Sequence, residues 1–168
     1  MKIGHVIPCY GKTNELYIST LVELSPSIGI EPEVLSSQFF NTALIDELHI
    51  KKIKLIGRSS NKTIEFLLKA YSRIFSEYKE YLPFIFTRKL NHGNYDLIHA
   101  HFGMSGCDLV NIKKPTLISM HGYDGNVAIK NKNFLNAYKK LAKNKYIHFS
   151  FPSDYFRQKV SLKLGLEQ

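Results

Sequence analysis

The fold is decided by two neighbouring segments: Asp96-Leu97-Ile98-His99-Ala100-His101-Phe102-Gly103 and Pro115-Thr116-Leu117-Ile118-Ser119-Met120-His121-Gly122-Tyr123-Asp124. Each contains an apolar run of strand length that ends in histidine and glycine, which is typical of a buried parallel strand. Glycine after a strand leaves room for a ligand near the backbone. Because ligands bind at the carboxyl ends of parallel strands, we expect His101, His121 and Asp124 at one functional edge.

The flanking sequence predicts a strand–helix–strand unit at the start of the chain. Residues 2–8 form an apolar strand, a helix capped by Thr13 or Asn14 runs to Gly29, and residues 33–37 form a second strand. Such a unit begins a Rossmann-like, doubly wound α/β fold with a mainly parallel sheet and helices on both faces. The apolar residues at helical spacing in the first helix are Tyr17, Leu21, Leu24 and Ile28.

The rest of the chain continues this alternation. We expect a partly exposed strand over residues 51–57 and an amphipathic helix over residues 64–82, which Pro83 should interrupt. A polar helix over residues 130–143 and a strand over residues 146–151 come after the two central strands. Ser153 should cap a final helix that Gly165 ends.

Bulk composition predicts one globular domain over residues 1–168, with 44% hydrophobic and 12% aromatic residues. Cys9 and Cys107 lie far apart without a zinc pattern, which favours a reduced, cytoplasmic chain. No signal peptide or membrane-spanning segment is predicted. The net charge of +9 favours an anionic partner, either nucleic acid, nucleotide or acidic lipid.

Two histidines share a face of one strand. His99 and His101 are two residues apart and therefore point the same way. They could ligate a metal together with His121, line a substrate-binding edge, or be hydrogen-bonded core residues. We interpret His99, deeper in the strand, as structural, and His101, beside Gly103, as a site residue.

The segment His121-Gly122-Tyr123-Asp124-Gly125 is the sharpest local feature. A histidine at a strand end, followed by flexible backbone, can hydrogen-bond a ligand hydroxyl or carbonyl. In the alternative interpretation, Asp124 only caps the loop by bonding its backbone. Gly11 follows the first strand without a full phosphate-binding fingerprint, so it could equally form a tight strand–helix turn.

A further run places aromatic residues beside cations. Phe84, Phe86, Arg88 and Lys89 would suit contact with an anionic membrane surface. The helix over residues 64–82 is expected to pack on the sheet rather than to bind nucleic acid, so no nucleic-acid partner is predicted.

Taken together, these motifs resemble the N-terminal half of the family 4 glycosyltransferases, retaining enzymes of GT-B fold. The resemblance rests on Pro8…Gly11…Asn14-Glu15, the segments around His101 and His121, and Ser153-Asp154-Tyr155-Phe156…Leu164-Gly165. It spans nearly the whole chain. The bacterial members that build exopolysaccharide, capsule or lipopolysaccharide are the most similar.

The resemblance implies an acceptor-binding domain that faces a nucleotide-sugar-binding domain across a cleft. His121 would contact the transferred sugar and act as the catalytic residue. Gly11 would approach the donor phosphates, and Glu15 would match the acidic residue at the helix start. The remaining predicted substrate-binding residues are His101, Gly103, Gly122, Asp124 and Ser153.

The resemblance also implies that the chain ends near Gly165, about where the linker to the nucleotide-sugar-binding domain would begin. Its partners would be a sugar or lipid-linked sugar acceptor and that C-terminal domain, at the inner face of the cell membrane. No tightly bound cofactor is expected, because the nucleotide-sugar is a co-substrate. Alone, the chain should be inactive. Two alternatives stay open: a non-catalytic module that docks a partner chain, and a metal-dependent hydrolase using His99, His101 and His121.

Overall fold

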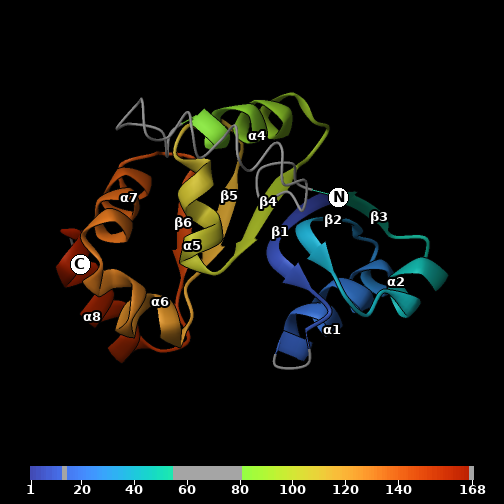
Figure 1. Cartoon of the computed structure of the whole chain (residues 1–168), viewed down its shortest axis with the longest axis horizontal. Coiled ribbons are helices and arrows are strands. Elements are labelled where there is room, and N and C mark those ends of the chain that lie inside the picture. Colours follow the sequence, from blue (N-terminus) through green and yellow to red (C-terminus); the bar gives the residue numbers. More distant parts are fainter. Residues whose placement is uncertain (13–14, 55–80, 167–168) are drawn as a thin grey trace, which may run out of the picture.

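The computed structural model describes residues 1–12, 15–54 and 81–166, and its centre is a parallel sheet of six strands (Figure 1). The strand order is β3-β2-β1-β4-β5-β6, and each neighbouring pair is parallel. This order reverses between β1 and β4, as in doubly wound Rossmann-like folds, so the predicted fold class is confirmed. The strands are β1 (Lys2–Tyr10), β2 (Glu31–Phe39), β3 (Lys51–Lys54), β4 (Leu97–His101), β5 (Thr116–Ser119) and β6 (Ile147–Ser150).

Helices cover both faces of this sheet (Figure 1). The first two lie beside β1–β3, and the later ones surround β4–β6 (Figure 1). The α-helices are α1 (Leu16–Leu24), α2 (Ala43–Glu47), α4 (Tyr81–His92), α5 (Gly103–Gly106), α6 (Gly122–Asn126), α7 (Lys132–Ala142) and α8 (Asp154–Leu164). Three short 3-10 helices are η2 (Ser25–Ile28), η4 (Cys107–Leu109) and η5 (Ala128–Lys130).

The two faces carry different cores. On one face, alternate residues of β4 and β5, such as Ile98, Ala100 and Ile118, pack with side chains of the later helices in a large core. On the other face, Ile7 and Val34 pack with Ile18 and Val22 of α1 in a smaller core. Strand alternation places His5, His99 and His101 on the face of the smaller core.

Beyond His99, the face of the smaller core becomes more exposed across β5 and β6. The pairing register continues His5 and His99 into Leu117 and His148, while Ser119 and Ser150 form the next row. These four residues of β5 and β6 are partly or fully exposed. A row of polar side chains therefore extends from the buried histidines to solvent.

Most predicted elements are confirmed. Ser153 caps α8 by accepting a hydrogen bond from the Phe156 backbone N–H at 3.2 Å, and Gly165 ends the helix in the left-handed conformation. Gly29 likewise ends the first helical segment, which turns into 3-10 helix at Ser25, just before Pro26. The predicted helix over residues 64–82 falls almost entirely outside the described residues.

Three local predictions were wrong. The predicted apolar face of α1 is exposed: Tyr17 is 52%, Leu24 60% and Ile28 75% accessible, whereas Ile18 and Val22 are buried. Tertiary packing selects the narrower stripe, because only that side of α1 meets the sheet. Pro83 does not interrupt the helix, since it lies within α4, which spans Tyr81–His92. The backbone after His121 is helical rather than flexible, since α6 begins at Gly122.

The amino-terminal edge of the sheet is held by a buried carboxylate. Glu33, 2% exposed, accepts hydrogen bonds from Lys51 Nζ at 3.0 Å and the Tyr95 hydroxyl at 2.6 Å, and pairs with Lys2 Nζ at 2.7 Å. Burial by itself would raise the pKa of Glu33, but the hydrogen bonds from Lys2, Tyr95 and Lys51 outweigh it and lower that pKa to about 2. This network ties β1, β2 and β3 together opposite the predicted functional edge.

Candidate functional site

Three loops meet at His121 on the carboxyl edge of the sheet. The ring of His121, which follows β5, lies 5.3 Å from that of Tyr17, in the first turn after the β1 loop. The ring of Phe102, which follows β4, lies 4.7 Å from the His121 ring on centroids. The predicted convergence of β4 and β5 ends is therefore present, and the β1 loop joins it.

His121 is held by the carboxylate of Asp124. His121 has extended backbone and caps α6, and its N–H donates to Asp124 Oδ2 at 2.9 Å. Asp124 Oδ1 accepts from the Met104 N–H and the Tyr138 hydroxyl, each at 3.3 Å. Asp124 is fully buried and thus joins α5, α6 and α7. These contacts agree with the alternative interpretation, in which Asp124 is a capping residue. Asp124 therefore positions the backbone of His121 from inside the protein.

The imidazole of His121 keeps one nitrogen without a protein partner. Its Nε2 is buried and makes no hydrogen bond among the described residues. Burial lowers the pKa of His121, although the charge of Asp124 opposes this shift. The ring is therefore neutral at neutral pH and can offer either one N–H or one lone pair. Buried polar atoms are nearly always hydrogen-bonded, so this nitrogen is available for a ligand.

Glu15 supplies a second polar group to this edge. Its Oε2 is buried and has no hydrogen-bond partner in the described part of the chain. Burial raises the pKa of Glu15, with Lys12 opposing. Burial, and then the charges of Glu15 and Asp124, raise the pKa of Tyr17. Glu15 precedes α1 without capping it, so its carboxylate is not used by the helix.

The three glycines predicted for the site differ in why a glycine is needed there. Gly11 has φ +78°, and a Cβ there would lie 2.6 Å from the Asn41 backbone, so a tight turn explains it. At Gly103, a Cβ would lie 2.5 Å from Met120 Sδ, so protein atoms fill the space expected for a ligand. At Gly122, the nearest atom to a Cβ is Asn126 Nδ2 at 3.9 Å. Only Gly122 lacks a packing reason among them.

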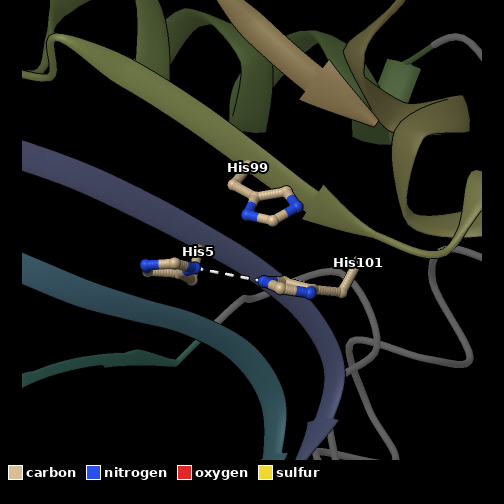
Figure 2. A group of neighbouring side chains, drawn as sticks. All are labelled: His5, His99 and His101. Atoms are coloured by element: carbon tan, nitrogen blue, oxygen red, sulfur yellow. Dashed lines mark hydrogen bonds between the residues drawn. The ribbon is translucent and has the colours of Figure 1, made fainter. Parts of the chain in front are cut away.

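A second cluster lies within the sheet, where His5, His99 and His101 face one another (Figure 2). His5 and His99 are register partners on β1 and β4. His5 Nδ1 is 3.1 Å from His101 Nε2, and the rings of His99 and His101 are 4.0 Å apart on centroids. His5 and His101 are each 2% exposed, while His99 is half-buried. The prediction that His99 and His101 share a face is confirmed.

These imidazoles are uncharged at neutral pH. Burial, followed by the charge of His99, lowers the pKa of His5 to about 3. Burial, followed by the charge of His121, lowers that of His99 to about 4. The pKa of His101 lies well below its usual value, chiefly through burial. His99 Nε2 is 2.8 Å from Ser119 Oγ, which in turn lies 3.2 Å from Ser150 Oγ.

The structure assembles a different metal-ligand set from the predicted one. Among the described residues, the three ligand atoms within 4.8 Å of one another belong to His5, His99 and His101, and not to His121. His5 was missed because it lies 94 residues before His99 in the sequence. Only the pairing of β1 with β4 places the two side by side. Tyr17 and Phe102 were also missed, since isolated aromatics near strand ends carry no distinctive pattern.

The other predicted residues belong to α4 or cap α8. Ser153 is exposed and its hydroxyl caps α8. Arg88 and Lys89 are exposed on α4, which leads into the amino end of β4, at the edge opposite His121. The side chains of Phe84 and Phe86 lie outside the described part of the structure. None of the described helices has the length and apolar character needed to cross a bilayer.

Comparison with known protein families and with curated proteins finds no match to this chain.

Proposed function

We propose that this chain binds the acceptor of a retaining glycosyltransferase, opposite a domain that binds the nucleotide-sugar. The observation that carries the proposal is the Nε2 of His121, which is buried without a partner among the described residues, in a ring that lies beside those of Tyr17 and Phe102. The proposal is further supported by the doubly wound sheet and by the motifs that resemble family 4 glycosyltransferases. Acceptors in this class are sugars or lipid-linked sugars.

The chemistry at this edge suits a sugar. Sugar hydroxyls donate and accept hydrogen bonds, and the His121 imidazole and the Glu15 carboxyl each have a buried atom that no described residue contacts by a hydrogen bond. Tyr17 and Phe102 supply apolar ring surface for the carbon-bound faces of a sugar ring. Asp124 fixes the backbone of His121, so that the imidazole is preorganised before the ligand arrives.

The opposing domain would supply what this edge lacks. Departure of a nucleoside diphosphate develops negative charge, which preorganised cations stabilise. Of the described residues at this edge, His121 is neutral, Glu15 and Asp124 are acidic, and the charge of Lys12 acts on Glu15, whose pKa it lowers. We therefore assign the acceptor side to this chain and assign the diphosphate contacts to the second domain.

Contact with an anionic membrane surface is a separate proposal, because α4 leads into the edge of the sheet opposite His121. The exposed Arg88 and Lys89 and the net charge of +9 favour anionic lipid. In a flotation assay, the chain should float with anionic vesicles at low salt and remain in the vesicle-free fraction at high salt. Equal flotation of an Arg88→Glu/Lys89→Glu variant would exclude α4 as the contact.

Sugar transfer by the enzyme assembled from this chain and its donor-binding domain tests the proposal. His121→Ala should lower the transfer rate by roughly 100-fold or more. The matched control is His148→Ala, because His148 is an exposed histidine on β6. Undiminished transfer by the His121→Ala enzyme would exclude the assignment.

A second candidate function is a non-catalytic module that docks a partner chain. It is favoured by the exposed apolar stripe on α1 and η2, formed by Leu16, Tyr17, Leu21, Leu24 and Ile28. Such contiguous apolar surface is typical of interaction sites. Under this hypothesis, one defined partner chain co-purifies with wild type and with His121→Ala, but not with Leu24→Glu. Loss of sugar transfer in His121→Ala, with the partner retained, would favour the enzyme instead.

A further inference from the structure

Three imidazoles that lie far apart in the sequence are buried together on one sheet face (Figure 2). We propose that His5, His99 and His101 bind a divalent transition-metal ion of the zinc class. This proposal does not depend on the sugar-binding role of His121, which is not one of the three residues. Metal binding can be measured with no sugar or donor-binding domain present.

The spacing of two nitrogens already fits such an ion. Zinc–nitrogen bonds are about 2.0–2.1 Å long, which places two nitrogens of a tetrahedral ion about 3.4 Å apart. His5 Nδ1 and His101 Nε2 are 3.1 Å apart. The same two nitrogens that share one proton in the metal-free chain are therefore close enough to bind one ion, once the rings turn so that both lone pairs point at it.

His99 completes the set. The three ligand atoms all lie within 4.8 Å of one another, so the His99 nitrogen needs to move by at most roughly 1.4 Å to reach ligand spacing. His99 is half-buried, whereas His5 and His101 are almost fully enclosed. Rotation of the most accessible of the three rings is the smallest rearrangement that closes the site.

Ser119 orients His99 for this role. His99 Nε2 lies 2.8 Å from Ser119 Oγ. When Nε2 carries the proton and donates it to Ser119, the lone pair of Nδ1 is free, and the ring faces the His5–His101 pair (Figure 2). Metal-ligating histidines characteristically donate their second ring N–H to an oxygen in this way, which fixes the tautomer and the ring direction.

The burial of the three rings also supports a metal site. Burying polar rings is costly, and apolar side chains would pack this sheet face at lower cost. Three imidazoles leave the fourth position of a tetrahedral ion open to water or to a ligand oxygen.

Metal content and binding test the proposal directly. Tag-free chain is stripped with a chelator, dialysed against Zn²⁺ and assayed for bound zinc, and Co²⁺ is added in parallel for its tetrahedral absorption spectrum. Wild type should bind about one equivalent, and Zn²⁺ should raise its unfolding temperature. His99→Gln and His101→Gln should bind at least about tenfold more weakly and lose the Co²⁺ spectrum.

His148→Gln is the matched control, because His148 is an exposed histidine in the same register row, on β6. It should bind as wild type does. Circular dichroism and cooperative unfolding establish that each variant is folded. Should the buried His101→Gln variant not fold, the half-buried His99→Gln variant decides. Less than about half an equivalent in wild type, or full binding by His99→Gln, would overturn the proposal.

Discussion

The backbone N–H of His121 donates a hydrogen bond to the Asp124 carboxylate at 2.9 Å, and this contact fixes the backbone from which the His121 ring projects. The same carboxylate accepts from Met104 N–H and the Tyr138 hydroxyl. One buried side chain thus connects the loop after β4, the cap of α6 and the body of α7. The position of the His121 ring depends on a group that a ligand does not touch.

Asp124→Ala should lower the free energy of unfolding by about 3 kcal/mol, because it leaves two backbone N–H groups and one hydroxyl without their acceptor. Urea denaturation measures the change. The control is Asp154→Ala, which removes an exposed aspartate from the first turn of α8 and should cost well under about 1 kcal/mol. Equal losses in the two variants would contradict the role given to Asp124.

Two glycines of α6 give a second matched pair. A Cβ at Gly125 would lie 2.3 Å from Phe156 Cζ, whereas one at Gly122 would meet nothing closer than 3.9 Å. Gly125→Ala should therefore lower the free energy of unfolding by about 1–3 kcal/mol through overpacking. Gly122→Ala should leave it unchanged or raise it by up to about 1 kcal/mol. Thermal unfolding of both variants checks this, and the reverse order would show that α6 is misplaced.

The buried face of α1 can be tested in the same way. Val22 is 0% exposed and Leu24 is 60% exposed. Val22→Ala should cost about 2 kcal/mol, from lost apolar burial and the resulting cavity. Leu24→Ala should change stability by no more than about 0.5 kcal/mol. If urea denaturation showed a larger loss of unfolding free energy for Leu24→Ala than for Val22→Ala, the buried face of α1 would be the one predicted from spacing alone.

Glu33 predicts an acid-dependent loss of stability. Its pKa is about 2 in the folded chain against an unfolded value of 4.5. The stabilisation is therefore complete above pH 4.5 and disappears as the pH falls through 2. The shift corresponds to up to about 3 kcal/mol at neutral pH. The stability difference between wild type and Glu33→Gln should shrink by that amount from pH 7 to pH 2 in denaturant titrations. A pH-independent difference would argue against the network of Lys2, Lys51 and Tyr95.

Much of the fold follows from local sequence. The apolar runs before His101 and His121 predict parallel strands, and Ser153 and Gly165 predict both ends of α8. These signals are local: a strand needs a short apolar run, and a helix end needs one capping residue. The convergence of His121 and Asp124 at one edge follows from the rule for parallel sheets.

The remaining features depend on tertiary contacts. The spacing of Tyr17, Leu21, Leu24 and Ile28 is helical, but only packing decides that Ile18 and Val22 meet the sheet. The histidine cluster needs the pairing of His5 with His99, which follows from strand order and register rather than from any short motif. The glycines were interpreted as room for ligand, yet Gly103 is required by Met120 and Tyr138.

The most direct test of the acceptor-binding account is saturation-transfer difference NMR on this chain, with a panel of sugars and a short-chain polyprenyl-diphosphate-linked sugar. The account predicts saturation transfer to at least one of these ligands, lost in His121→Ala and kept in His148→Ala. Transfer to none of them, or equal transfer with His121→Ala, would contradict it.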